Sequence, residues 1–195
     1  GIHKIGFSNP VYLSEKATAD RNYALAYFMK ETNETKKVGF PENTNINETL
    51  ELYFQSCSIE VNTEILSIVA STLANGGVNP FTGKRIFSTK TVQNMLSMML
   101  MCGMYDYSGE FAFKIGIPAK SGVAGAIMIV VPNVMGIVTW SPRLDSIGNS
   151  ARGIEFCKEF GKLFSFHIFD TGEDNEKINP LLNYYNSTKM NMFSE

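Results

Sequence analysis

The sequence has few of the side chains that commonly bind metals. It contains 2 histidines and 3 cysteines, and the cysteines at positions 57, 102 and 157 lack Cys-x-x-Cys spacing. A structural zinc site needs about four such ligands at short, regular spacings. We therefore expect no protein-bound metal. The cysteines lie in apolar stretches, which predicts buried free thiols in a reducing compartment.

Long apolar runs and clusters of basic residues are also missing. No uncharged apolar run reaches the roughly 18 residues that a membrane helix needs. The 17 lysines and arginines are balanced by 19 acidic residues, for a formal net charge of -2, whereas nucleic-acid-binding domains usually carry a basic patch. The composition therefore argues against a membrane or nucleic-acid partner and favours an ordinary globular chain.

The first residues, "GIHKIGFSNP", have neither the anatomy of a signal peptide nor an initiator methionine. We therefore expect a piece from the middle of a longer protein. The total of 195 residues fits one medium domain or part of a larger one.

The first half of the chain has the periodicity of helices. Apolar residues recur at helical spacing in residues 15–30, whereas residues 31–47 are polar and contain a glycine and a proline, as loops do. Further helices are expected over residues 47–61, 62–77 and 88–103.

The second half changes character. Short, apolar, β-prone segments at residues 109–117, 122–131 and 135–142 predict three antiparallel strands, and an amphipathic closing helix is expected over residues 148–166. Helices followed by a meander and a closing helix indicate an α+β fold. We expect residues 1–170 to form the domain and residues 171–195 a polar C-terminal tail.

A polar triplet, Lys120-Ser121-Gly122, interrupts the apolar sequence of the second half. Taken alone, it is an ordinary strand start with a solvated lysine. A Lys-[Ser/Thr]-Gly triplet on a strand beside a helical subdomain is, however, typical of penicillin-recognising serine enzymes. In those enzymes the edge of this strand lines an acyl-transfer site.

Longer blocks carry a more specific resemblance. The segments "LANGGVNPFTGKRI", "CGMYDYSGEFAFKIGIPAKSGVAG" and "SPRLDSIGNSARG" resemble the serine-dependent glutaminases, and "GFSNPVYLSEKATADRNYALAYF" and "LYFQSCSIEV" match further blocks in the same order. The resemblance covers about residues 5–170. It implies a β-lactamase/transpeptidase-like fold and hydrolysis of glutamine to glutamate and ammonia through a serine acyl-enzyme. It implies no metal and no organic cofactor.

The resemblance also assigns substrate-binding residues. It implies that Glu15 receives the α-ammonium of the substrate, Asn22 helps to hold the α-amino-acid end, and Tyr53 reaches the substrate carboxylate with its hydroxyl. A carboxylate suits an ammonium through a charge-assisted hydrogen bond. Without the resemblance, Glu15 would be an acid at a helix start and Tyr53 a core aromatic.

Three further residues are implied in catalysis. The resemblance places Tyr105 beside the nucleophile as a proton shuttle, and a phenol needs a nearby cation to act as a base near neutral pH. Lys120 could supply part of that charge. Val123 would contribute its backbone N–H to an oxyanion hole, together with the nucleophile's own N–H. The alternative is that Tyr105 only fills a turn.

The family's nucleophile is the serine of a Ser-x-x-Lys motif, and this chain contains no such motif. We therefore expect the C-terminal half of a glutaminase catalytic domain, inactive by itself. Two alternatives remain. One is another penicillin-binding-like serine acyl-transfer enzyme, which is disfavoured because Glu15, Asn22 and Tyr53 suit a small amino acid. The other is a non-catalytic oligomerisation or interaction fragment.

The resemblance has implications beyond the site. It implies a homo-oligomer, either a dimer or a tetramer, and phosphate as an activator in animal members. It also implies an intracellular location, which would be cytoplasmic in a bacterium and mitochondrial in an animal.

Overall fold

The computed structural model describes residues 4–36, 38–170 and 177–180. The chain forms two compact units, Gly1–Asn62 (the N-terminal unit) and Thr63–Glu195 (the C-terminal unit). Each unit has its own hydrophobic core, so each is described by itself. Within the described residues, no helix is long and apolar enough to cross a membrane.

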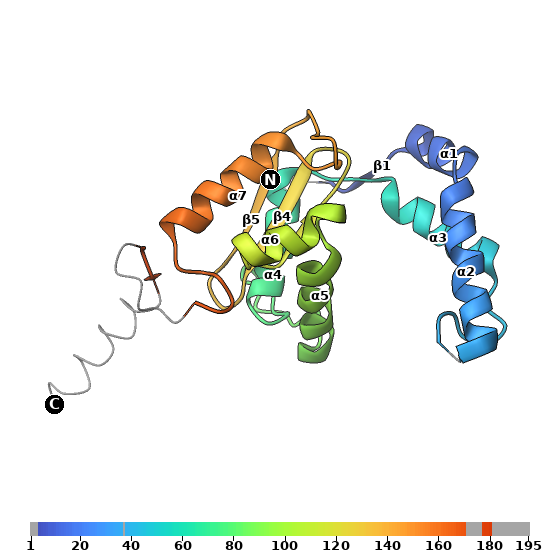
Figure 1. The fold of residues 1–195 in the computed structure, drawn as a ribbon, viewed down its shortest axis with the longest axis horizontal. Helices are drawn as coiled ribbons and strands as arrows, with labels where there is room; N and C mark the ends of the chain where they lie inside the picture. The colour runs from blue at the N-terminus through green and yellow to red at the C-terminus, as the bar shows by residue number, and fades with distance from the viewer. Residues whose placement is uncertain (1–3, 37, 171–176, 181–195) are drawn as a thin grey trace, which may run out of the picture. The chain divides into compact units, whose positions relative to one another are not determined.

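The N-terminal unit packs three helices around a small core and closes with a two-stranded antiparallel sheet (Figure 1). Its core consists of Ala19, Ala26, Ile46, Leu50 and Phe54. The elements are β1 (Gly6–Phe7), α1 (Asn9–Ala17), α2 (Asp20–Lys36), α3 (Ile46–Cys57) and β2 (Ile59–Glu60).

The single helix predicted over residues 15–30 is wrong, because the chain breaks between α1 and α2. Thr18 ends α1: its backbone N–H reaches the carbonyls of Ser14 and Glu15, and its hydroxyl donates to the Ser14 carbonyl at 2.9 Å. Threonine is a modest helix former whose side chain competes for nearby backbone groups. The helix then restarts and continues to Lys36, into the predicted loop.

The C-terminal unit is built on a three-stranded antiparallel sheet of order β3-β4-β5. This result confirms a three-stranded antiparallel meander, the α+β layout and the closing helix, although the first strand is not the predicted one. The elements are α4 (Thr63–Ala74), α5 (Thr89–Cys102), the 3-10 helix η1 (Tyr105–Tyr107), α6 (Ser108–Lys114), β3 (Ala119–Ser121), β4 (Ala126–Val131), β5 (Met135–Trp140) and α7 (Ala151–Leu163).

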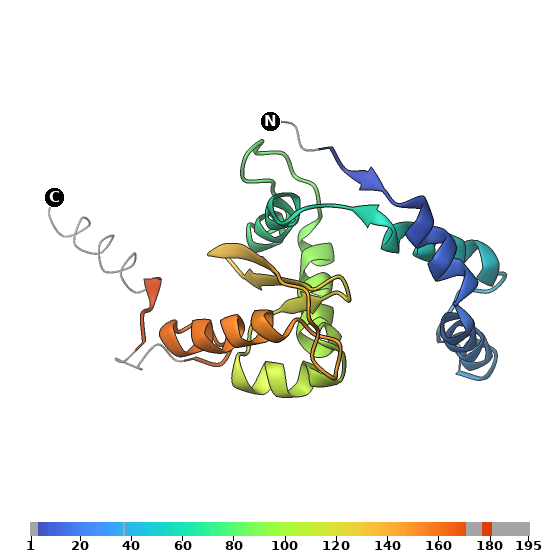
Figure 2. The ribbon, with the colours of Figure 1, turned by 90° about the horizontal axis from the view of Figure 1, so that it is seen from above.

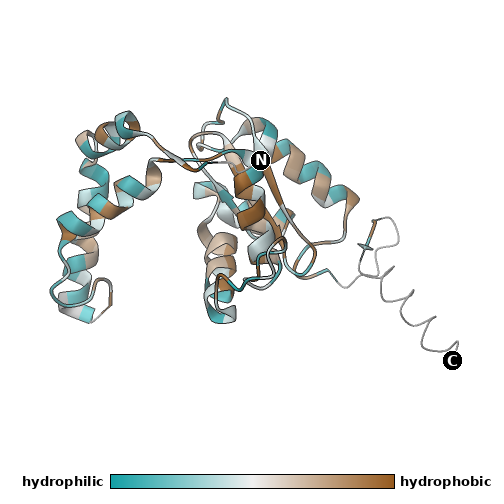
Figure 3. Cartoon of the chain, turned by 180° about the vertical axis from the view of Figure 1, so that it is seen from behind, coloured by the Kyte–Doolittle hydropathy of each residue, from teal (hydrophilic) through white to brown (hydrophobic). Residues whose placement is uncertain are grey.

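Helices cover both faces of this sheet, as Figure 2 shows. Successive side chains of a strand point to opposite faces, and β4 uses both. Ile127 and Ile129 pack with apolar residues of α6 and α7, whereas Val130 packs with residues of α4 and α5. The strands accordingly carry much of the hydrophobic colour of this unit in Figure 3. The central strand is therefore buried on both sides, and β3 lies at one edge of the sheet.

The first predicted strand, residues 109–117, is wrong. Its first six residues belong to α6, which ends at Lys114. Phe111 and the capping residue Ile115, spaced one helical turn apart, are both buried, while Phe113 is exposed. Glu110 and Lys114 form an ion pair at 2.6 Å on the exposed side. The alternation of Phe111, Ala112 and Phe113 resembled a strand, but burial follows the helical spacing.

The cysteines differ from the expectation of three buried thiols. Cys57 and Cys102 are exposed, and Cys157 is buried in α7. Burial raises the pKa of the Cys157 thiol to about 12, so this thiol stays protonated and unreactive in the folded unit.

The predicted tail lies mostly outside the described residues, since only residues 177–180 of it are described. There the backbone N–H of Ile178 donates to the Leu163 carbonyl at 2.9 Å, and the Ile178 carbonyl accepts from the N–H of Ser165 at 3.1 Å. This short segment therefore pairs with the chain that leaves α7.

Candidate active site

A close contact between α5 and β3 positions the candidate catalytic group of the C-terminal unit. The backbone N–H of Ser121 donates to the carbonyl of Gly103 at 2.8 Å. A Cβ at position 103 would collide with the carbonyl oxygens of Ala119 and Met99, so only glycine allows this approach. The contact brings Tyr105, two residues after the glycine, to the end of β3.

The polar triplet closes β3 and does not open the apolar strand that follows. Lys120 pairs with Met128 and Ser121 with Ile127. Residues 122–125 then form a turn, in which the N–H of Gly125 donates to the Gly122 carbonyl at 2.9 Å. The strand predicted from residue 122 therefore begins only at residue 126. Val123 lies in the turn and is 69% exposed.

Tyr105 and Lys120 meet at the carbonyl oxygen of Ser121, and Val123 contacts Tyr105. The Tyr105 hydroxyl donates to this oxygen at 3.5 Å, and the Lys120 ammonium donates to the same oxygen. The Lys120 Nζ also lies 5.2 Å from the centroid of the Tyr105 ring, within the range of a cation–π contact. The backbone N–H of Val123 hydrogen-bonds to the Tyr105 hydroxyl. The structure thus groups all three residues that were predicted to act in catalysis.

The environment of Tyr105 favours the neutral phenol. Burial raises the pKa of Tyr105 above its ordinary range, and the hydrogen bond from the Val123 N–H opposes that shift. The Lys120 ammonium lies over the ring face. The arrangement can therefore present a hydroxyl, an ammonium and a backbone N–H to one oxygen atom of a ligand, which is the chemistry needed to stabilise developing negative charge.

The turn that carries Val123 is held by Trp140. Its indole Nε1 donates to the Ala124 carbonyl at 2.9 Å, and the neighbouring Ser141 N–H donates to the Gly125 carbonyl at 3.0 Å. The sequence alone does not predict this support, because it depends on the pairing of Ala126 with Trp140 between β4 and β5.

The N-terminal unit brings Glu15, Asn22 and Tyr53 together from three different helices. Burial raises the pKa of Tyr53, and so do a hydrogen bond with Cys57 and the charges of Cys57 and Glu15. A hydrogen bond with Asn22 lowers this pKa. Cys57 is a neighbour that the sequence analysis missed, although it stands one helical turn after Tyr53 on α3. The cluster offers a carboxylate, an amide and a phenol, which together suit a small zwitterion.

Charged and polar contacts between α1 and α3 hold this cluster in place. The Lys16 Nζ lies 2.8 Å from the Glu51 carboxylate, and the Tyr12 hydroxyl donates to the same carboxylate. Since Lys16 follows Glu15 on α1, these contacts fix the part of α1 that presents Glu15. Over the described ranges, no group of three or more His, Cys, Asp and Glu side chains could hold a metal ion.

Comparison with known proteins identifies the family. The glutaminase family model matches residues 1–169. The mitochondrial liver isoform of glutaminase from Mus musculus is 54% identical over 170 residues, which is 87% of this chain and 27% of that protein. The glutaminase of Microcystis aeruginosa is 49% identical over 164 residues, which is 84% of this chain and 46% of that protein.

A solved structure agrees with these relatives. The Bacillus subtilis glutaminase YbgJ, in its covalent complex with 5-oxo-L-norleucine, superposes with a TM-score of 0.75 at 35% identity, over 86% of this chain and 57% of that one. The neighbouring structures are glutaminases, which have the β-lactamase-like fold, so the predicted fold class is confirmed. The chain spans about half or less of the length of these relatives. The chain belongs to the glutaminase family.

Proposed function

We propose that this chain forms part of the active site of an enzyme that hydrolyses L-glutamine to L-glutamate and ammonia. The observation that carries the proposal is the linked set of Tyr105, Lys120 and Val123 at the end of β3, in a chain whose family is glutaminase. A hydroxyl, an ammonium and a backbone N–H at one point match the needs of acyl transfer from an amide.

The cluster of the N-terminal unit binds the amino-acid end of glutamine. Glu15 accepts hydrogen bonds from the α-ammonium, Asn22 helps to hold the same end, and the Tyr53 hydroxyl donates to the α-carboxylate. The raised pKa of Tyr53 supports this role, because a phenol that stays protonated remains a donor. The preference for a small zwitterion distinguishes this site from one that binds a peptide or a β-lactam.

The reaction divides between this chain and a nucleophile that it does not contain. The serine of the family's Ser-x-x-Lys motif attacks the amide carbon, and the Val123 N–H stabilises the oxygen as it gains charge. Tyr105 relays the proton that the departing ammonia needs, and Lys120 stabilises charge near the Tyr105 ring. Water then hydrolyses the glutamyl ester.

The contact between Val123 and Tyr105 links the proposed oxyanion donor to the proposed proton relay. The N–H that would hold the carbonyl oxygen of glutamine hydrogen-bonds to the Tyr105 hydroxyl. Substrate binding would exchange that partner for the carbonyl oxygen and release the phenol for proton transfer.

The assembly and location follow as further proposals. The enzyme acts as a homo-oligomer, a dimer or a tetramer, and phosphate activates it if the source is an animal. It works inside the cell, in the cytoplasm of a bacterium or in an animal mitochondrion. Support for the second location is that the mouse relative is described as mitochondrial.

A direct assay tests the activity. The full-length enzyme, meaning the gene product that contains this chain, should release equal amounts of ammonia and glutamate from L-glutamine. The 195-residue chain should release neither, because it has no Ser-x-x-Lys motif. Benzylpenicillin in place of glutamine tests the alternative of a penicillin-recognising enzyme. Full-length protein that opens the β-lactam and leaves glutamine intact would contradict the proposal.

A covalent probe provides a second readout. The structural neighbour from Bacillus subtilis forms a covalent complex on reaction with 6-diazo-5-oxo-L-norleucine. Mass spectrometry of the full-length enzyme after the same treatment should show one added 5-oxo-norleucine group. The 195-residue chain should stay unlabelled and serves as the control for non-specific alkylation.

A further inference from the structure

Tyr105 has a backbone conformation that few residues other than glycine adopt. Its φ is +54°, in the left-handed region. Such conformations persist only where the surrounding structure holds them, and they cluster at functional sites. The groups that hold this turn are therefore candidates for a role in placing the Tyr105 hydroxyl.

Two buried side chains bind the backbone around Tyr105. The Ser108 hydroxyl accepts a hydrogen bond from the Met104 N–H at 2.9 Å and donates to the Tyr105 carbonyl at 2.6 Å. The Asn149 Nδ2 donates to the Met104 carbonyl at 3.2 Å, and the Tyr107 N–H donates to the same carbonyl at 3.2 Å. Ser108 acts locally, whereas Asn149 comes from 45 positions along the chain.

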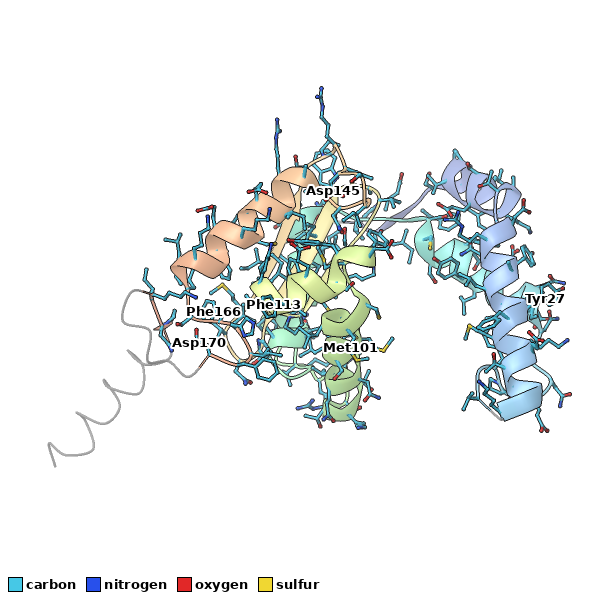
Figure 4. The ribbon with its side chains drawn as sticks, viewed as in Figure 1. Tyr27, Met101, Phe113, Asp145, Phe166 and Asp170 are labelled. Atoms are coloured by element: carbon cyan, nitrogen blue, oxygen red, sulfur yellow. The ribbon has the colours of Figure 1, made fainter. Side chains whose placement is uncertain are left out.

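Asn149 is itself held firmly in the loop that precedes α7. The Oδ1 of Asp145, labelled in Figure 4, accepts the backbone N–H groups of Ile147, Gly148 and Asn149 at 2.9, 2.9 and 3.0 Å. The Asp145 N–H donates back to the Asn149 carbonyl at 2.7 Å. These contacts close residues 145–149 into a compact turn that fixes the Asn149 amide.

The same turn also contacts the ring of Tyr105. A Cβ built at Gly148 would lie 3.7 Å from the Tyr105 Cε2 atom, so the ring packs beside the Gly148 backbone. The loop thus touches Tyr105 at the ring through Gly148 and at the preceding peptide through Asn149.

Burying the Asn149 side chain costs folding free energy, and packing alone does not explain why the residue is there. The residue is fully buried, and its Oδ1 has no hydrogen-bond partner among the described residues. A buried acceptor without a partner is destabilising, and an apolar residue of similar size would avoid that cost. What the side chain does contribute is its Nδ2 donor, which hydrogen-bonds to the peptide immediately before Tyr105.

We propose that Asn149 is a positioning residue that holds Tyr105 in its left-handed conformation and thereby keeps the hydroxyl at the Val123 N–H and the Ser121 carbonyl. The inference rests on the proposed function, because the consequence of losing that position is a slower reaction. Asn149 acts through Tyr105 and touches no substrate.

The test is a double-mutant cycle in the full-length enzyme. Asn149→Leu removes the donor at similar volume and should lower kcat about tenfold or more, since small displacements of a catalytic group can cost up to about a hundredfold. The KM for glutamine should change by less than about threefold. The variant Asn149→Leu/Tyr105→Phe should be no slower than Tyr105→Phe, because interactions made through one group are not additive.

Ser150→Ala is the matched control. Ser150 lies beside Asn149, is equally buried, caps α7 through the Gly153 N–H at 3.1 Å and donates to the Ser141 carbonyl at 2.8 Å. Its loss should reduce thermal stability while kcat stays near that of the wild type. If Asn149→Leu does not fold, Asn149→Ser removes the amide without adding bulk and carries the same expectation.

The outcomes separate this inference from the proposed function. Additive losses of kcat in the double variant, unchanged kcat in Asn149→Leu, or an equal loss in Ser150→Ala would each overturn the positioning role while glutaminase activity stands. A wild-type full-length enzyme that leaves glutamine intact would overturn the proposed function itself. In that case a crystal structure of Asn149→Leu with φ of Tyr105 still near +54° would also remove the structural basis of the inference.

Discussion

At the residue scale, the proposed roles divide the candidate residues into those expected to bind the substrate and one expected to move a proton. Glu15 and Asn22 both act on the Tyr53 hydroxyl within the N-terminal unit, and the proposed roles of the three residues concern binding. Tyr105 is 38% exposed, at the end of β3, and its proposed role concerns the chemical step. Substitutions in the two groups should therefore affect different kinetic constants.

Glu15→Gln should weaken glutamine binding in the full-length enzyme. The change keeps the shape of the side chain and removes the charge that pairs with the α-ammonium. Loss of one partner of a buried, hydrogen-bonded charge pair costs about 2–5 kcal/mol, so KM should rise by at least about tenfold. The control is Glu155→Gln, which removes a surface ion pair with Lys158 on α7 and should leave both constants unchanged. An unchanged KM and kcat in Glu15→Gln would remove this residue from the pocket.

Tyr105→Phe should lower kcat more than it raises KM, because a proton relay acts in the transition state. The pH profile gives a second readout. Burial raises the pKa of Tyr105, so the hydroxyl remains protonated through neutral pH, and activity that depends on it should be lost only at alkaline pH. That alkaline loss should be absent from the residual activity of Tyr105→Phe. If the substitution lowers only the melting temperature, Tyr105 merely fills the turn.

At the scale of elements, the turn between β3 and β4 is the feature on which the oxyanion proposal depends. The turn places the Val123 N–H outside the strand ladder and next to the Tyr105 hydroxyl. Trp140 and Ser141 hold it through the Ala124 and Gly125 carbonyls. The proposed oxyanion role thus rests on a backbone group that side-chain scanning would miss.

Val123→Pro should reduce kcat of the full-length enzyme by about a hundredfold or more, the scale for losing one oxyanion-hole donor. Val123→Ala keeps the N–H and should retain most of the activity. Proline can also disturb the turn itself, so circular dichroism and glutamate binding must be compared for both variants. A folded Val123→Pro enzyme with near-normal turnover would contradict the oxyanion role.

The elements also show how far the sequence could predict the structure. The helix over residues 88–103 and the strand of residues 135–142 follow ordinary periodicity and capping, and they were found close to their observed bounds. The strand predicted at residues 109–117 is wrong, because a short, apolar, β-prone segment fits a strand as well as a helix. Packing against the sheet decides the burial of Phe111 and Ile115. The helix break at Thr18 is also hard to predict, because Thr18 caps α1 within a stretch whose apolar spacing is helical throughout.

The candidate residues could be predicted from the sequence, whereas the contacts that support them could not. Resemblance to known motifs named Glu15, Asn22, Tyr53, Tyr105, Lys120 and Val123, and the structure groups them within each unit. The supporting contacts of Trp140 and Asn149 could not be predicted, because they join positions far apart in the sequence. Such contacts depend on strand register and loop closure, which no local pattern encodes.

At the scale of the whole molecule, the described residues form one hydrophobic cluster in the N-terminal unit and two in the C-terminal unit. The N-terminal unit ends at Asn62 and builds its core from five residues on and beside three helices. The C-terminal unit buries a sheet between helices on both faces. Small units bury a smaller share of their surface and are correspondingly less stable.

In the isolated 195-residue chain, the N-terminal unit should therefore unfold at lower urea than the C-terminal unit. Cys157 reports on the second event, because it is buried in the core of the C-terminal unit and its raised pKa, about 12, keeps the thiol unreactive until that core opens. In a Cys57→Ser/Cys102→Ser background, far-ultraviolet circular dichroism should lose helix signal before Cys157 reacts with a thiol reagent. Non-coincident transitions are the mark of more than two states. A single transition in which helix loss and Cys157 labelling coincide would mean that the two units unfold as one.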